Sequence, residues 1–225
     1  MIRITNTEVY GWEAAIRGMR NPMNSWDKSD SYYGCEDVRC YDCDCSDECD
    51  LLYYHKNYEI GDNDLGLMKK LSNAGPDHGK FLRMITVTMD VNAPLYWWKE
   101  FDTYKVGTVA NSCSTMHKIH AKPFDIDDFS TDHLTDFNWN RLADLIDHMN
   151  ICREKFIKTK DKSWWWQLIQ LLPSSYNQLR TVQLNYQVLK SMYHARKNHK
   201  LNEWRDFCAW IRTLPYSELI TGEDI

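Results

Sequence analysis

The stretch KFLRMITVTMDVNAP, residues 80–94, has the clearest structural pattern in the sequence. Apolar residues alternate with polar ones along it, which is typical of a half-buried strand. The apolar face holds Ile85, Val87, Met89 and Val91. In the segment that follows, PLYWWKEFDTYKVG, 94–107, the apolar spacing changes to that of a helix, and Gly107 is a typical helix stop.

Outward from this strand, the sequence predicts elements of both kinds. Residues 1–26 predict a short strand and then a helix, and 61–75 predict a helix with Asp62 or Asn63 as N-cap and Gly75 as its stop. On the C-terminal side, apolar stripes predict four helices, over 138–158, 163–172, 176–197 and 201–214. The 225 residues contain no internal repeat, so we predict a single α+β domain, 1–225, with a helix-rich C-terminal half.

Composition and charge argue against two classes of protein. The formal net charge is −5, whereas a protein that coats nucleic acid needs a basic excess. The sequence has no window of 18 apolar residues, and its N-terminus lacks an apolar signal core. We therefore expect a cytoplasmic protein that binds neither nucleic acid nor membrane, and its eight cysteines are expected to be thiols.

Five cysteines cluster in an acidic segment, 27–60, that we interpret as an insertion. They are Cys35, Cys40, Cys43, Cys45 and Cys49. A structural zinc site usually takes two close pairs separated by a longer loop, and this spacing does not provide them. Neighbouring carboxylates also raise thiol pKa values and so disfavour thiolates. We expect no metal here, with a zinc-stabilised loop as the alternative.

The stretch YKVGTVANSCSTMH, 104–117, is predicted to begin at a helix end and to continue as a loop of small hydroxyl, thiol and amide side chains. With the segment before it, this stretch resembles a motif of the flavin-dependent thymidylate synthases, Arg-His-Arg-x-x-Ser-x-Asn-Glu-x-Ser-x-Arg. Ala93–Pro94 and the helix precede it as in that family, and Asn111 and Ser114 stand where the family has Asn-Glu-x-Ser.

A second segment, 171–207, also resembles that family. Asn185 follows Pro173 by 12 residues and Arg196 follows Asn185 by 11, which is the family's spacing, and NEWRDF is similar to its Trp-Glu element. PDHGKF, 76–81, is similar to its Glu-His element, so the resemblance spans about 76–215.

The family's Arg-His-Arg triplet is not retained. Aligned on Asn111 and Ser114, the triplet becomes Tyr104-Lys105-Val106, and aligned on Ala93–Pro94 it becomes Thr103-Tyr104-Lys105. In both alignments Lys105 alone keeps a positive charge. The motif's glutamate is Ser112 and its last arginine is Met116.

The resemblance implies a central, mostly antiparallel sheet flanked by helices, in a homotetramer with sites between subunits. It implies an enzyme in which NADPH reduces FAD and methylenetetrahydrofolate supplies the one-carbon group that converts dUMP to dTMP. It implies FAD contacts at His78, Asn111 and Asn185, and nucleotide contacts at Lys105, Ser114 and Arg196, with Ser114 also catalytic.

Ordinary structural roles are the alternatives for these residues. Arg196 could be a surface arginine at a helix end, Ser114 a capping residue, and His78 a surface histidine. Asn185, expected inside a helix, needs partners that either a flavin edge or a neighbouring helix could supply. For the whole protein, the alternatives are a nucleotide-binding or regulatory module without catalysis, and a metal-stabilised interaction protein that uses the cysteine segment.

Overall fold

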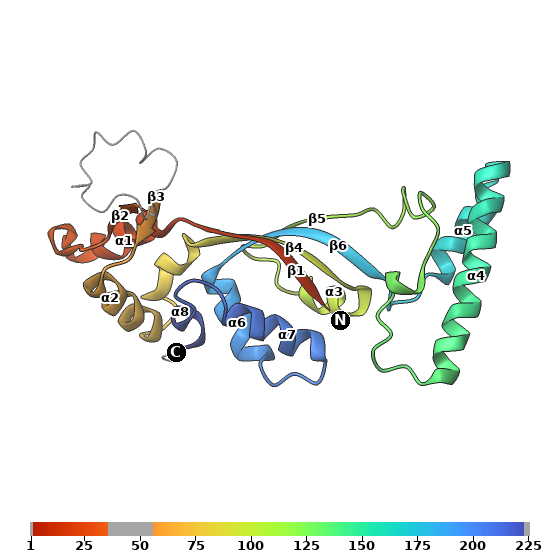
Figure 1. The fold of residues 1–225 in the computed structure, drawn as a ribbon. Coiled ribbons are helices and arrows are strands. Elements are labelled where there is room, and N and C mark those ends of the chain that lie inside the picture. The colour runs from red at the N-terminus through yellow and green to blue at the C-terminus, as the bar shows by residue number, and fades with distance from the viewer. Residues whose placement is uncertain (1, 36–55, 223–225) are drawn as a thin grey trace. The chain divides into compact units, whose positions relative to one another are not determined.

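The structure, a computed structural model, describes residues 2–35 and 56–222 as a mixed fold of helices and strands (Figure 1). The strands are β1 (Arg3–Tyr10), β2 (Tyr32–Cys35), β3 (Lys56–Glu59), β4 (Thr86–Pro94), β5 (Val109–Ser112) and β6 (Asn177–Asn185). The helices are α1 (Trp12–Arg20), α2 (Asp62–Asn73), α3 (Leu95–Phe101), α4 (Asp136–Thr159), α5 (Lys162–Leu171), α6 (Tyr186–Arg196), α7 (Asn202–Ile211) and α8 (Glu218–Thr221). Short 3-10 helices are η1 (Asn21–Met23), η2 (Trp26–Lys28), η4 (Gly79–Arg83) and η5 (Ile126–Asp128).

Four strands form one antiparallel sheet in the order β1-β4-β6-β5, and β2 pairs with β3 in a second, two-stranded sheet. The predicted α+β class, with an antiparallel sheet flanked by helices, is confirmed. Among the described residues, no helix has both the length and the apolarity that a membrane span requires.

The chain divides into two compact units, which are described separately. The first unit comprises Met1–Glu8, Thr88–Leu184 and Ala195–Trp210. The second comprises Val9–Val87, Asn185–His194 and Ile211–Ile225.

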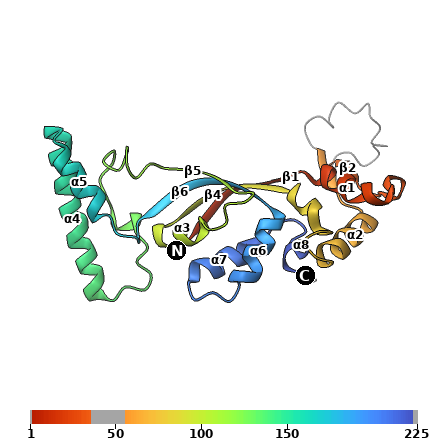
Figure 2. The same ribbon diagram turned by 180° about the vertical axis from the view of Figure 1, so that it is seen from behind.

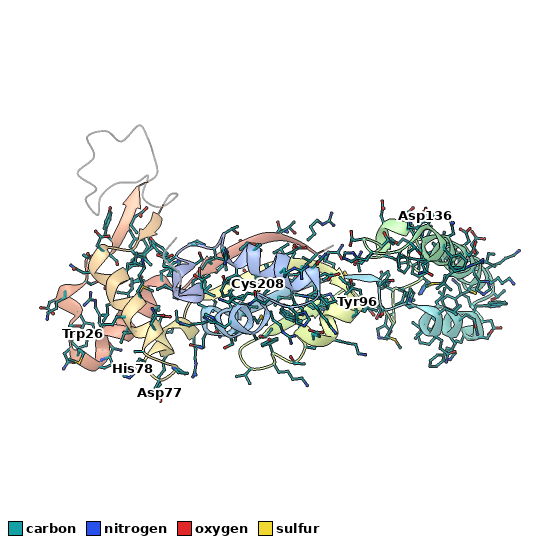
Figure 3. All side chains as sticks on the ribbon, turned by 90° about the horizontal axis from the view of Figure 1, so that it is seen from below. Trp26, Asp77, His78, Tyr96, Asp136 and Cys208 are labelled. Carbon is teal, nitrogen blue, oxygen red and sulfur yellow. The ribbon has the colours of Figure 1, made fainter. Side chains whose placement is uncertain are left out.

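The first unit has an aromatic core between α3 and α7. Trp97 and Trp98 of α3 are completely or almost completely buried, and the Trp97 ring lies 4.9 Å from that of Trp204 on α7. The Tyr96 hydroxyl (Figure 3) bonds the carboxylate of Glu203, which is also buried. Since aromatic side chains supply large apolar areas, this cluster holds α3 and α7 together.

A second core of the first unit lies between α4 and α5, which run side by side in Figures 1 and 2. The stripe predicted on α4 is confirmed, because Leu142, Ile146 and Met149 are buried. They pack with Phe124 and Phe129 from the segment that precedes the helix.

The second unit is organised around a buried ion pair. The Arg20 guanidinium on α1 donates to the Asp64 carboxylate on α2 at 2.6 Å, and both side chains are almost fully buried. The other Asp64 oxygen accepts hydrogen bonds from the hydroxyls of Ser29 and Ser31. A buried charge is tolerated only when it is paired and hydrogen-bonded, and here both conditions hold.

The structure corrects the helix predicted over 176–197. Residues 177–185 form β6, and only Tyr186–Arg196 are helical. Val182 and Leu184 are buried while Thr181 and Gln183 are exposed, so the side chains alternate as on a strand. Pairing with β4 on one side, and with β5 at Arg180–Gln183 on the other, then takes up backbone groups of this segment.

Three predicted boundaries are also corrected. The strand predicted from residue 80 begins at Thr86, because Gly79–Arg83 form the 3-10 helix η4, which buries the adjacent side chains of Phe81 and Leu82. The helix predicted to Gly107 ends at Phe101, and the Thr103 hydroxyl donates to the backbone carbonyl of Glu100 in the last turn. The loop predicted over 104–117 contains β5 at the sheet edge.

The N-cap of α2 is Gly61, and not Asp62 or Asn63 as predicted. The carboxylate of Asp30 accepts the backbone N–H groups of Asn63 and Asp64, at 2.9 and 3.1 Å. A side chain more than thirty residues away therefore satisfies donors that a local cap would otherwise take.

Candidate functional site

The first unit contains a pocket of about 660 Å³ beside the loop that follows β5. The loop contributes Cys113 and Ser114, β1 contributes Arg3, and the beginning of β6 contributes Asn177. A pocket of several hundred Å³ is the usual size of a small-molecule site. Of the residues predicted to contact the nucleotide, Ser114 lies in its lining.

Ser114 has a defined role in the loop. Its hydroxyl oxygen accepts the backbone N–H of His117 at 2.8 Å, and the side chain is half-buried. This contact is the capping role considered as an alternative, and it leaves the hydroxyl hydrogen available to a ligand in the pocket.

Asn111 and Lys105 are both exposed, and neither is among the lining residues of the pocket. Asn111 lies on β5 opposite Thr181 of β6. Lys105 lies in the turn between α3 and β5, with no ion pair to the residues that the structure describes.

Arg196, at the end of α6, is held by the aromatic core of its own unit. Its Nη1 lies 2.8 Å from an oxygen of Glu100, and its Nε donates to the Tyr104 hydroxyl at 3.0 Å. Its guanidinium also lies over the Trp204 ring, 4.8 Å from the centroid. The same Glu100 oxygen accepts the indole N–H of Trp204 at 2.9 Å. Arg196 is thus already paired with a carboxylate, and a nucleotide phosphate would have to displace Glu100 to bind it.

Arg180 on β6, another arginine of the first unit, is also engaged. Its Nη1 pairs with Asp102 at 2.8 Å, its Nε donates to Gln178, and its guanidinium stacks over the Trp98 ring. Lys118 differs, because it lines the pocket and makes no ion pair or side-chain hydrogen bond within the described ranges 2–35 and 56–222.

The other two predicted FAD contacts, His78 and Asn185, belong to the second unit. His78, labelled in Figure 3 beside Asp77, is exposed on the turn before η4. Asn185 is the last residue of β6 and not, as predicted, an interior helix residue. Its side-chain oxygen accepts the N–H of Val188 at 3.0 Å, so it caps the N-terminus of α6.

These two residues suit hydrogen bonding to an FAD molecule. The cap uses the side-chain oxygen of Asn185 and leaves its amide group as a donor, while the His78 ring is open to solvent. Lys80 and Arg83, both exposed on η4 directly after His78, offer positive charge that a pyrophosphate requires.

The fold of the chain matches that of the flavin-dependent thymidylate synthase of Helicobacter pylori, whose structure contains FAD and dUMP. The match covers 98% of both chains with a TM-score of 0.65 and 14% sequence identity. This chain has the flavin-dependent thymidylate synthase fold. The resemblance inferred from the sequence is thereby confirmed at the level of the fold.

The fold of the chain is also similar to that of a UMP/dUMP methylase of Streptomyces cacaoi, whose structure is bound with 5-bromo-dUMP. Its TM-score is 0.56, with 12% identity, over 99% of this chain and 94% of the methylase. No protein-family model and no curated protein matches the sequence.

Of the predicted cysteine cluster, Cys40, Cys43, Cys45 and Cys49 lie outside the described residues, and Cys35 is described only as the end of β2. Within the described residues, no group of three or more His, Cys, Asp or Glu side chains is placed to hold a metal ion.

The sequence analysis did not identify several pocket residues. Arg3, Tyr176 and Asn177 line the pocket together with Lys118 and Ser114, although long stretches of sequence separate them. No motif or spacing marks them, because the sheet order β1-β4-β6-β5 brings them together.

Proposed function

We propose that this chain is a divergent flavin-dependent thymidylate synthase-like protein that binds FAD and a pyrimidine deoxynucleotide of the dUMP type. We further propose that it is an enzyme that transfers a one-carbon unit to the base. One observation carries the proposal: the chain shares its fold, from end to end, with a synthase whose structure holds FAD and dUMP. The pocket at Ser114 supports it, because hydroxyl and cationic donors surround a cavity of suitable size.

Within this proposal, Ser114 binds the nucleotide and positions it for the reaction through its free hydroxyl hydrogen. Lys105 and Arg196 are the further nucleotide contacts that the resemblance implies. For Arg196 this role requires the guanidinium to leave Glu100, so a bound phosphate must compete with a carboxylate already at 2.8 Å.

His78, Asn111 and Asn185 are proposed to hold FAD through their polar side chains. FAD supplies the redox chemistry when bound, while the protein binds and orients it. The resemblance brings with it NADPH and methylenetetrahydrofolate as co-substrates, a homotetrameric assembly and a cytoplasmic location, and these belong to the proposal.

A second candidate is a nucleotide-binding module without catalysis. The observation in its favour is the state of the cations: Arg196 is paired with Glu100, Arg180 with Asp102, and the Arg-His-Arg triplet is absent from the sequence. Each of these cations is stabilised where it lies, and would have to be released before it could hold a phosphate.

Three measurements on the full-length protein test the proposal in sequence. Visible absorbance before and after FAD addition measures flavin binding, calorimetry measures dUMP binding, and dTMP formation is followed with NADPH and methylenetetrahydrofolate. All three are expected to be positive for the enzyme. Binding of dUMP without dTMP formation would identify the second candidate. A protein that binds neither FAD nor dUMP would overturn both candidate functions.

Ser114→Ala with Ser112→Ala as its matched control locates the nucleotide site. Both serines lie at the same sheet edge, and Ser112 is exposed on β5 and is not among the pocket residues. Loss of one neutral hydrogen bond is expected to weaken dUMP binding by roughly 3- to 10-fold in Ser114→Ala and to leave Ser112→Ala unchanged. Equal affinities in the two variants would remove Ser114 from the site.

A further inference from the structure

We propose that the pocket in the first unit binds a phosphate monoester, with Lys118 and Arg3 as its cationic contacts. The proposal rests on the proposed function, and it identifies cations of this chain that take over from the missing arginines. Neither residue was assigned this role from the motif positions.

The charge balance of the pocket favours an anion. Three cations and two carboxylates line it, so the net charge of the lining is positive. Lys122 and Asp128 neutralise each other through an ion pair at 2.5 Å. Of the remaining charges, Asp127 is negative, while Lys118 and Arg3 are positive and make no ion pair with the described residues. A dianionic group would therefore meet two unpaired cations against one carboxylate.

Neutral donors in the lining add to this preference. The Tyr176 side chain is half-buried and its burial raises the pKa of the phenol, so the hydroxyl remains a donor at neutral pH. The amide oxygen of Asn177 is occupied by the Ser130 hydroxyl at 2.8 Å, which leaves the amide nitrogen as the donor. Ser114 contributes its hydroxyl hydrogen, because its oxygen already accepts from His117.

Apolar side chains complete the pocket. Phe124 and Ile119 line the pocket. Both side chains are more than nine-tenths buried, because they also pack in the core between α4 and α5, so they form a fixed wall. A cationic and donor-rich side combined with an apolar wall suits a phosphate attached to a ring, as in a nucleoside monophosphate.

Other cations of the first unit are less suited to this role. Arg196 and Arg180 already have carboxylate partners, at 2.8 Å in both cases. Moving either arginine to a ligand would take away the guanidinium of Glu100 or of Asp102, and this loss opposes ligand binding. Lys118 and Arg3 bring no such penalty.

Calorimetric titration with dUMP, deoxyuridine and inorganic phosphate tests the assignment. The variants are Lys118→Ala and Arg3→Ala, with Lys118→Arg to restore the charge. Lys99→Ala is the matched control, since Lys99 is an exposed lysine of α3 in the same unit and is not among the pocket residues. Each alanine variant is expected to lose roughly 10- to 100-fold in dUMP affinity, because one charge-assisted hydrogen bond is removed.

The three probes separate the failure of this assignment from failure of the proposed function. Deoxyuridine affinity should be the same in all variants, and Lys118→Arg and Lys99→Ala should match the unmodified protein for dUMP. If dUMP binds equally well to every variant, the pocket is not its phosphate site, although the proposed function stands. A third outcome is that inorganic phosphate binds, that Lys118→Ala abolishes this binding, and that dUMP does not bind. It would confirm the phosphate site and refute dUMP as the ligand. If neither phosphate nor dUMP binds, both are overturned.

Discussion

Arg196→Ala is expected to destabilise the first unit by about 2–3 kcal/mol. The guanidinium makes a charge-assisted hydrogen bond to Glu100 at 2.8 Å, which is worth about 1.5–3 kcal/mol. Its stacking on the Trp204 ring at 4.8 Å adds about 0.5–1 kcal/mol. Because the side chains of Arg196 and Glu100 are 20% and 33% exposed, water screens part of the pair, and the lower part of the summed range applies.

Urea unfolding monitored by tryptophan fluorescence measures this change, since Trp204 is in contact with the arginine. A loss of 2–3 kcal/mol corresponds to a fall in Tm of about 4–12 °C for a chain of this length. Arg196→Lys should lie between the unmodified protein and the alanine variant, because it keeps a charge and loses the planar fork.

Arg141→Ala is the matched control for an arginine ion pair at the surface. Arg141 pairs with Asp144 on α4, and both side chains are more than 65% exposed, so its removal should change stability by no more than about 0.5 kcal/mol. The reasoning fails if Arg196→Ala is as stable as Arg141→Ala while its dUMP affinity falls. That result would mean that Arg196 serves the ligand and that its contacts to Glu100 and Trp204 contribute little to folding.

Two further predictions concern the second unit. Asp64→Asn should lower the free energy of unfolding by about 3–5 kcal/mol, because it leaves the buried Arg20 guanidinium without its charged partner, and urea titration would show this. Burial alone would raise the pKa of Asp64, but hydrogen bonds from Ser29, Ser31 and Arg20 lower it. Its stabilising effect is therefore present above the unfolded pKa and should fade as the pH drops below about 4, and this part of the acid sensitivity should be absent in Asp64→Asn. Asn185→Ala should cost about 1 kcal/mol through loss of the α6 cap, with FAD affinity measured alongside; a larger loss of stability would mean that the side chain makes more than its contact to Val188.

Strands and helices could be predicted from the sequence where the spacing of their apolar residues matches only one of the two structures. The apolar face of β4 was predicted residue by residue, and the helix predicted over 138–158 corresponds to α4, which buries Leu142, Ile146 and Met149. The segment 177–185 fits both periods: Val182 and Leu184 suit a strand, while the spacings of seven from Val182 to Leu189 and of four from Leu184 to Val188 also suit a helix. Pairing with β5 decides between them, and that partner begins 68 residues earlier in the chain, at Val109.

The candidate site shows the same limit. Ser114 could be predicted because the resemblance marks its position, and the structure places it in a pocket. The ion pair between Arg196 and Glu100 could not be predicted, since 96 residues separate the two and nothing local indicates their contact. The sequence therefore indicates which residue types a site could use, and the fold decides which of them are already engaged.

The flanks of the segment 36–55 are tied to the second unit at both ends. Tyr32–Cys35 of β2 is in register with Lys56–Glu59 of β3, so Cys35 lies directly opposite Lys56. On the N-terminal side, Asp30 holds the start of α2. The two flanks are thus held side by side by contacts between residues outside 36–55. The closure of this position is therefore a property of the second unit itself, because the β2–β3 ladder and the Asp30 contacts join the two flanks.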